Sequence, residues 1–288
     1  MKQLNLFLEL TRLKRPIGYL LLFWPCAWGL TIAYDFDQNL DKYFFYLSLF
    51  FLGAILMRSA GCIINDIADK DFDKKVSRTK NRPIASGIIS VKKGFVYSGV
   101  LCGLAFLVLI NFNTFTILLA LGSMPLAFTY PLMKRFTYWP QLFLGITFNY
   151  GLILGWTSIN NEINIIPILF YFGAIFWTLG YDTIYGFQDI KDDEIIGIKS
   201  TSIKFKNQPI LFLIFCYSLF LIILLLIGIL MNYSLFYYFG LSVILIQLFY
   251  FQLSKLKFDT PYVCLKVFKS NNILGLFVFI NLFIENYI

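Results

Sequence analysis

Apolar and polar positions alternate in long blocks along the 288 residues of this chain. About 20 apolar residues span the hydrocarbon core of a bilayer as one helix. Because lipid offers the backbone no hydrogen bonds, such blocks are expected to be helical. The pattern predicts an all-α polytopic membrane bundle of nine transmembrane helices, which we expect to form one domain over residues 1–288. The predicted spans are 17–34, 44–64, 94–111, 114–133, 139–158, 164–185, 209–231, 234–254 and 271–287.

Composition supports a membrane protein and excludes several kinds of site. Hydrophobic residues make up 59% of the chain and charged residues 14%, against about 25% charged in soluble domains. Basic residues before the first block resemble a signal peptide, but the block is too long for one and lacks a small-residue cleavage site. The absence of histidine excludes imidazole metal sites, His-ligated haem and His-based triads. The five cysteines are scattered along the chain, and we interpret them as small apolar residues and not as disulfides or zinc ligands.

The net charge of +8 is distributed unevenly along the chain. Of the 24 basic residues, all but Lys42 and Arg58 lie before the first block or in the connections after the second, fourth, sixth and eighth blocks. Such connections face the cytoplasm under the positive-inside rule. The charge therefore indicates a multi-pass protein with a cytoplasmic N-terminus, and it needs no nucleic-acid partner. We expect this protein in a bacterial inner membrane.

An acidic stretch follows directly on the second block. It contains Asn65, Asp66, Asp69, Asp71 and Asp73 within nine residues. On a helix, the carboxylates of Asp66, Asp69 and Asp73 would share one face and repel one another. A lysine, an arginine or a divalent cation is therefore expected between them. Carboxylate oxygens with room for water and phosphate suit Mg²⁺ better than a transition metal.

A second acidic cluster ends the sixth block, on the same predicted side of the membrane. It contains Asp182, Asp189 and Asp193. The interval between Asp189 and Asp193 repeats that between Asp69 and Asp73, which is a weak two-fold echo.

Two facing clusters of this kind could clamp a diphosphate. Each would hold a divalent cation through one or two oxygens, and Arg78, Arg82 and Lys199 could neutralise the remaining phosphate charge. If the diphosphate carried an allylic lipid tail, its departure would leave a carbocation that aromatic faces could stabilise. The tail itself could stay in the bilayer.

Simpler interpretations remain open for several of these residues. Acidic and basic runs are often solvated loops, and Lys134 and Arg135 could be positive-inside anchors. Asn65 could be a helix C-cap. Arg58 lies inside an apolar block, where a charge is costly and commonly functional. It could bind a substrate carboxylate, or instead pair with Asp66 or Asp182.

Several motifs together resemble the UbiA-type intramembrane aromatic prenyltransferases, and within them the 4-hydroxybenzoate polyprenyltransferases of ubiquinone biosynthesis. The resemblance covers essentially the whole chain. Its motifs are Arg15-Pro16-Ile17-Gly18, Met57-Arg58-Ser59-Ala60-Gly61-Cys62, Asn65-Asp66-x-x-Asp69-x-x-x-Asp73, Arg78-Thr79-x-Asn81-Arg82-Pro83, Ser86-Gly87, Tyr130-Pro131-x-Met133-Lys134-Arg135, Tyr181-Asp182-Thr183-x-Tyr185, Asp189-x-x-x-Asp193 and Gly197-Ile198-Lys199-Ser200-Thr201. Lys14 and Lys191 depart from the family pattern, in which an acidic residue is usual.

The resemblance implies nine helices around a central cavity that opens sideways to lipid and is capped by cytoplasmic loops. It implies transfer of a polyprenyl group from polyprenyl diphosphate to 4-hydroxybenzoate, ortho to the hydroxyl. The expected catalytic and Mg²⁺-binding residues are Asp66, Asp69, Asp73, Asp189 and Asp193. The expected substrate-binding residues are Asn65, Arg58, Arg78, Arg82, Lys134, Arg135, Asp182 and Lys199.

Three other functions are compatible with parts of the sequence pattern. The same fold could use another acceptor, such as haem or a naphthoate. A membrane phosphatidyltransferase would also use paired aspartates, but its Asp-Gly-x-x-Ala-Arg run is missing from the sequence. A transporter would favour a corresponding pair of broken helices, and the sequence shows no convincing pair.

Overall fold

The computed structural model describes residues 2–76 and 78–287, and secondary structure within these residues consists of helices. Eight helical spans are long and apolar enough to cross a membrane, and Ile17–Ala33 is a shorter apolar helix. Together they confirm the predicted all-α polytopic bundle. The long helices are α2 (Ile17–Ala33), α3 (Leu40–Ala68), α5 (Val91–Leu109), α6 (Thr114–Thr129), α8 (Pro140–Asn160), α9 (Ile165–Gly186), α12 (Pro209–Leu230), α13 (Leu235–Leu245) and α14 (Pro261–Tyr287).

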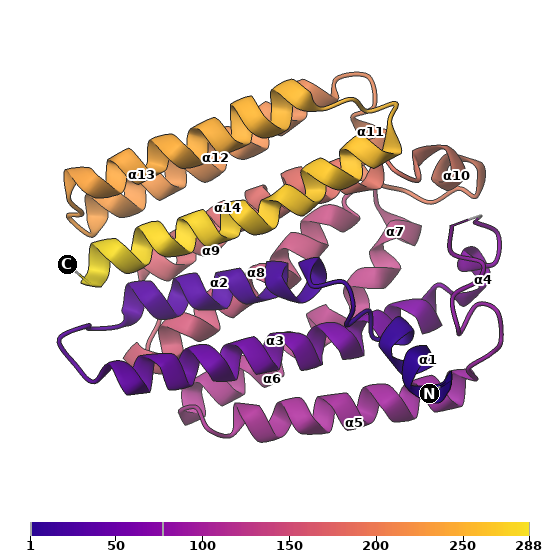
Figure 1. Ribbon diagram of the computed structural model, residues 1–288, viewed down its shortest axis with the longest axis horizontal. Coiled ribbons are helices and arrows are strands. Elements are labelled where there is room, and N and C mark those ends of the chain that lie inside the picture. The colour runs from indigo at the N-terminus through magenta and orange to yellow at the C-terminus, as the bar shows by residue number, and fades with distance from the viewer. Residues whose placement is uncertain (1, 77, 288) are drawn as a thin grey trace.

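Short helices gather at one end of the bundle. Figure 1 shows α1, α4, α7, α10 and α11 at this end, with the N-terminus, while the C-terminus lies at the opposite end. The α13 span continues through a π-helical turn (η2) and a 3-10 turn (η3). The short elements are α1 (Lys2–Leu10), α4 (Lys70–Asp73), η1 (Tyr130–Leu132), α7 (Met133–Phe136), α10 (Ile190–Ile195), α11 (Thr201–Lys204), η2 (Ile246–Gln252) and η3 (Leu253–Lys255).

Helix starts at the other end are fixed by short polar side chains. Asn39, Asn113, Asn164 and Ser234 each precede a helix, and each side chain accepts a hydrogen bond from a backbone N–H of that helix. These caps satisfy N–H groups that have no partner within the helix. They allow α3, α6, α9 and α13 to begin after connections of only a few residues.

Two differences from the predicted boundaries change where charged residues lie. The helix α3 runs to Ala68, so Asp66 lies in its last turn rather than in a connection. The helix α14 begins at Pro261, so Lys266 and Lys269 lie on a helix instead of in the eighth connection. Hydropathy marks only the part of a helix that lipid surrounds, and both helices extend beyond their apolar blocks.

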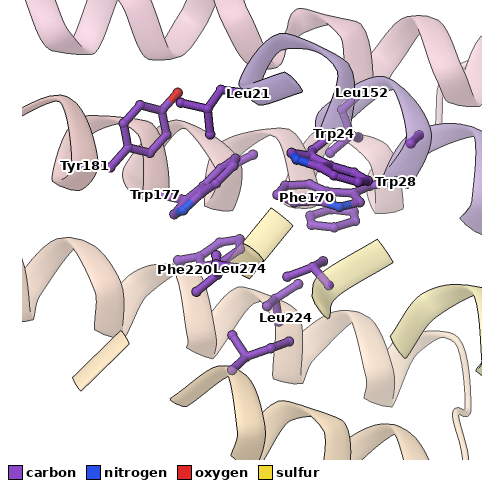
Figure 2. Packing of buried hydrophobic residues seen from close by; sticks show 14 of the residues in the cluster. Leu21, Trp24, Trp28, Leu152, Phe170, Trp177, Tyr181, Phe220, Leu224 and Leu274 are labelled. Atoms are coloured by element: carbon purple, nitrogen blue, oxygen red, sulfur yellow. The ribbon is translucent and has the colours of Figure 1, made fainter. Parts of the chain in front are cut away.

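An aromatic core joins α2, α9 and α12. Trp28 stacks on Phe170 with ring centroids 5.5 Å apart, and its ring lies 5.0 Å from that of Trp177. Trp177 also stacks on Phe220 of α12. Figure 2 shows these rings side by side, with Leu274 of α14 close to Phe220. Because aromatic rings bury large areas at low conformational cost, this core fixes the helices that border the site.

The helices α2 and α8 touch through their backbones. A Cβ atom added at Gly29 would lie 2.0 Å from the Leu152 carbonyl oxygen, and one added at Gly155 would lie 2.3 Å from the Cys26 carbonyl oxygen. No side chain fits at either position. The contact brings α8 against one wall of the cavity described next.

A cavity of about 360 Å³ lies between α2, α3, α5, α6 and α8. Its described lining is almost entirely apolar, and Arg58 is the charged side chain in it. Arg58 and Tyr130 lie toward the end with the short helices, and Phe50 and Phe112 toward the other end. The bundle therefore holds a long apolar cavity with one charged side chain, Arg58, near the end with the short helices.

We predict that the short helices face the cytoplasm, because the connections at that end carry almost all basic residues. Lys80→Cys and Lys204→Cys, both at exposed positions of that end, should resist a membrane-impermeant thiol reagent in intact cells and react after lysis. Glu162→Cys is the control at the opposite end and should react without lysis. Rapid labelling of either lysine position in intact cells would overturn the orientation.

Candidate active site

The first acidic cluster lies where α3 ends. Asp66 is in the last turn, Asp69 caps the helix, and Asp73 ends the four-residue α4. Only 2%, 2% and 7% of these residues' surfaces are exposed. The predicted single helical face is replaced by a break at Asp69. The bend still leaves all three residues buried at the same end of the bundle.

Arginines neutralise two of these carboxylates. One Asp66 oxygen accepts from Arg12 at 2.5 Å and from Arg82 at 3.2 Å. Arg82 also donates to Asp73 at 2.8 Å, so a single guanidinium bridges two aspartates. Buried like charges are tolerated only with such partners. The expectation that a cation stands between the aspartates is met here by arginine.

Asp69 has a different partner and a free oxygen. One oxygen accepts a hydrogen bond from the Lys134 ammonium at 2.5 Å. The other, Oδ1, is buried without a hydrogen-bond partner. Burial raises the pKa of Asp69, although Lys134 opposes the rise. A buried, partnerless carboxylate oxygen is costly unless another group binds it.

The second acidic cluster repeats this local geometry. Asp189 precedes α10 as Asp69 precedes α4, and in each case the aspartate four residues later donates its backbone N–H to the first one's carbonyl, at 2.8 Å for Asp73 and 2.9 Å for Asp193. Burial and the Asp189 carboxylate raise the pKa of Asp193 to about 6. The repeated Asp-x-x-x-Asp interval thus corresponds to a repeated backbone hydrogen bond.

Contacts between the connections bring the two clusters together. Arg78, from the segment after α4, donates hydrogen bonds to both carboxylate oxygens of Asp189. The Lys199 backbone N–H donates to the Lys134 carbonyl at 2.9 Å. The positive charges of Lys134 and Arg78 partly offset the rise in the pKa of Asp193. The two clusters therefore lie close together, with cations between them. We call this region, which contains Asp66, Asp69, Asp73, Asp189 and Asp193, the mouth.

Two of the basic residues predicted to bind substrate, Arg135 and Lys199, donate hydrogen bonds to backbone carbonyl oxygens in this structure. Arg135 donates to the Ala68 carbonyl and lies over the Phe72 ring. The Lys199 ammonium donates to the Phe136 carbonyl at 3.3 Å. Neither forms an ion pair among the described residues. Their positions support the shape of the mouth without placing charge on the aspartates.

Arg58 lies in the cavity without a carboxylate partner among the described residues. Its Nε is buried and makes no hydrogen bond. Its guanidinium lies 5.2 Å from the centre of the Phe148 ring and beside Gly18, where an added Cβ would come within 2.7 Å of Nε. The alternative of a structural ion pair with Asp66 or Asp182 is not observed.

Asn65 and Asp182 are half-buried, and their side chains make no hydrogen bond within the described chain. Asn65 lies in the last turn of α3, and Asp69 is the cap, so the C-cap reading of Asn65 is wrong. Both side chains remain free to bind a ligand.

Sequence reasoning missed Arg12. It follows α1 in the left-handed region at φ 56° and reaches the Asp66 carboxylate. Its neighbours Lys14 and Arg15 made it look like one of several positive-inside flanking charges. Neither spacing nor composition signals a left-handed arginine, so no pattern in the sequence could have found it.

The carboxylates suit Mg²⁺ chemically but do not form a closed cage. Among the described residues, no three acidic or cysteine side chains converge on one metal position. The available donors are oxygens, and Asp69 Oδ1 has no other partner. Mg²⁺ is commonly held by one or two carboxylates plus water and substrate phosphates. The residues therefore fit an ion that arrives together with an anionic ligand.

Comparison with known proteins gives a consistent result. The profile of the UbiA prenyltransferase family matches residues 22–281. The chain is 43% identical to the 4-hydroxybenzoate polyprenyltransferase, mitochondrial, of Bos taurus, over 99% of this chain and 76% of the relative.

Solved structures share the fold. An apo UbiA homologue from Aeropyrum pernix K1 aligns with a TM-score of 0.77 and 19% identity, covering 93% of this chain and 98% of that one. A UbiA homologue from Archaeoglobus fulgidus bound to GPP and Mg²⁺ aligns with a TM-score of 0.69 and 19% identity, over 98% and 100%. The family match over residues 22–281 and the 43% identity to the Bos taurus relative show that the chain belongs to the UbiA prenyltransferase family.

Proposed function

We propose that this chain is a Mg²⁺-dependent 4-hydroxybenzoate polyprenyltransferase acting in ubiquinone biosynthesis, with one catalytic domain over residues 1–288. The observation that carries the proposal is the placement of one unpaired arginine inside an apolar cavity, below a mouth of paired aspartates. Arg58 precedes Asp66 by eight residues on α3, which is about 12 Å along the helix. The site thus offers separate places for a diphosphate, an apolar tail and a small anionic acceptor. The name of the similar Bos taurus protein, 4-hydroxybenzoate polyprenyltransferase, supports this activity.

The diphosphate would bind at the mouth. Mg²⁺ would be held by oxygens of Asp66, Asp69, Asp73, Asp189 and Asp193, with Asn65 alongside. Bound there, the metal would stabilise negative charge on the leaving diphosphate.

Binding of the diphosphate would change the partners of the basic residues. Arg12, Arg78, Arg82 and Lys134 now pair with the carboxylates. With metal on the carboxylates, these four cations would be released to bind phosphate oxygens, for which arginine's planar fork is well suited. The same side chains thereby stabilise the empty site and the loaded one.

The chemistry would follow where the mouth meets the cavity. The bond between the allylic carbon and the diphosphate oxygen breaks, and the electron pair leaves with the diphosphate. The ring carbon ortho to the phenol hydroxyl forms the new carbon–carbon bond, and the ring then loses its proton. Apolar walls keep water away from the intermediate cation.

Arg58 would position the acceptor. A carboxylate can form a two-pronged, charge-assisted pair with a guanidinium. The partnerless Nε provides a donor for such a pair. A neutral phenol could not satisfy this buried charge, so the arginine would select for a carboxylated ring.

We further propose that the protein resides in a bacterial inner membrane with this mouth toward the cytoplasm. The basic connections surround the mouth. Charged diphosphate could therefore reach the site from the cytoplasm while the tail remains in lipid.

Asp66→Asn tests the role of the mouth. The change removes the charge and keeps the shape, so transfer should fall by about 100-fold or more at saturating Mg²⁺. The protein should also lose thermal stability, because Arg12 would lose its carboxylate partner. The matched control is Asp71→Asn in the same segment, whose side chain is 88% exposed. Equal transfer rates in the two variants would show that the Asp66 carboxylate takes no part in the reaction.

Arg58→Lys tests the position of the acceptor. Lysine keeps the charge but loses the fork, so KM for 4-hydroxybenzoate should rise by about tenfold while KM for the prenyl diphosphate changes little. For an uncharged phenol analogue, KM should be the same in the variant as in the unchanged protein. A parallel rise in both KM values would place Arg58 on the diphosphate side.

A further inference from the structure

A second hollow lies on the outer face of the bundle, between the α13 span and α14. It encloses about 360 Å³, and its lining is apolar except for the amide of Gln247. In Figure 1, α13 lies at one edge of the bundle and α5 at the opposite edge. We call this hollow the α13–α14 groove, and its lining residues are Val243, Ile246, Gln247, Phe251, Ile273 and Phe277.

Gln247 lies near the middle of a membrane-spanning segment. The helix α13 and its continuation through η2 and η3 form one apolar span from Leu235 to Lys255. At the helical rise, Gln247 is about 18 Å from Leu235 and about 12 Å from Lys255. Water is absent from the hydrocarbon at this depth, so an amide there can bond only to protein or to another molecule within the bilayer.

The amide of Gln247 makes no hydrogen bond within the described chain. It lies in the π-helical turn η2, a rare geometry that is frequent at functional sites. Gln252, at the end of the same turn, accepts a hydrogen bond from Tyr217 at 3.1 Å and donates one to Asn271 at 3.2 Å. The other amide side chains of η2 and α14 are all bonded: Gln252, Asn271, Asn272, Asn281 and Asn286. Gln247 is therefore an exception that calls for a partner outside the chain.

The chemistry of the amide and the symmetry of the membrane favour a second copy as that partner. An acyl chain offers no hydrogen bond. A carboxamide carries both donors and an acceptor, so two of them can bond to each other. Copies inserted in the same orientation hold Gln247 at the same depth. A two-fold axis along the membrane normal therefore brings the two amides together, as in the self-complementary interface of a symmetric dimer.

We infer that the α13–α14 groove is an interface between two copies of this chain in the membrane, joined by a hydrogen-bonded pair of Gln247 side chains. The exposed apolar residues Val243 and Ile246 of one copy pack into the groove of the other. Polar side chains that bond between helices stabilise such contacts within lipid. No residue of α13 or α14 lines the cavity beneath the mouth, so pairing through this face leaves the cavity unobstructed.

Gln247→Cys tests the pairing directly. Two thiols at the same depth on a two-fold axis should form an intermolecular disulfide when membranes holding the full-length protein are treated with copper phenanthroline. Val100→Cys is the matched control, because Val100 lies midway along α5, is 58% exposed and faces away from α13. The yield of covalent dimer should be at least about tenfold higher for Gln247→Cys than for the control or the unchanged protein. Equal yields, or a cross-link from position 247 to a different protein, would overturn the inference.

Gln247→Leu tests whether the amide holds the two copies together. Single-molecule photobleaching in lipid bilayers gives the dimer fraction at a series of protein-to-lipid ratios. Loss of the amide pair should weaken association by about threefold to thirtyfold. The melting temperature in detergent should stay unchanged, because Gln247 has no partner within the described chain. Gln252→Leu makes the same chemical change in the same turn and should lower the melting temperature, because Gln252 is bonded inside the bundle.

The dimer measurement does not depend on the reaction that the protein catalyses. Equal association of Gln247→Leu and the unchanged protein would overturn the inference, as would a monomer at every protein-to-lipid ratio. Absence of prenyl transfer in the unchanged protein would refute the proposed function and leave the dimer prediction in place.

Discussion

Carboxylates buried at the end of a membrane bundle must be neutralised, and this constraint shapes the whole site. Asp66, Asp69 and Asp73 are nearly inaccessible, and each is paired with a cation from elsewhere in the chain. Removing one member of a buried pair is expected to cost several kcal/mol. The pairs therefore tie the N-terminal segment and the connections between the long helices to the end of α3.

The same constraint supports the proposal that the site binds a charged ligand without rearranging its own charged groups. The cations stand where the ligand's negative charge would arrive, and the carboxylates stand where a metal would arrive. An incoming metal and diphosphate would exchange partners with groups already in place. Arg58 differs, because it has no carboxylate partner among the described residues and its Nε makes no hydrogen bond. In the proposed function, the mouth binds the diphosphate and the cavity binds the carboxylate of the acceptor.

Much of this arrangement follows from the sequence. Hydropathy located the helices because lipid forces every backbone group to be satisfied internally. Charge spacing located both acidic clusters and placed them on one side. The sequence could not predict which cation meets which carboxylate, since Arg12, Arg78 and Lys134 are far along the chain from the aspartates that they bind. Arg12 reaches Asp66 only through a left-handed backbone, and Arg135 and Lys199 bind carbonyl oxygens that hydropathy does not mark.

The size of the cavity was also beyond sequence reasoning. It depends on the close contact of α2 with α8. Glycine positions and apolar lengths are compatible with many helix arrangements. Phe50 and Phe112, whose rings lie together at the end of the cavity far from Arg58, come from different segments and could not be paired by spacing.

The central claim is that metal and diphosphate enter together by displacing the cations from the carboxylates. Mg²⁺ binding to the purified protein, measured by calorimetry with and without a prenyl thiolodiphosphate that resists ionisation, tests it most directly. The account predicts weak Mg²⁺ binding alone and an affinity at least about tenfold higher with the analogue, a coupling that must be reciprocal. Equal Mg²⁺ affinity in the two conditions would contradict it.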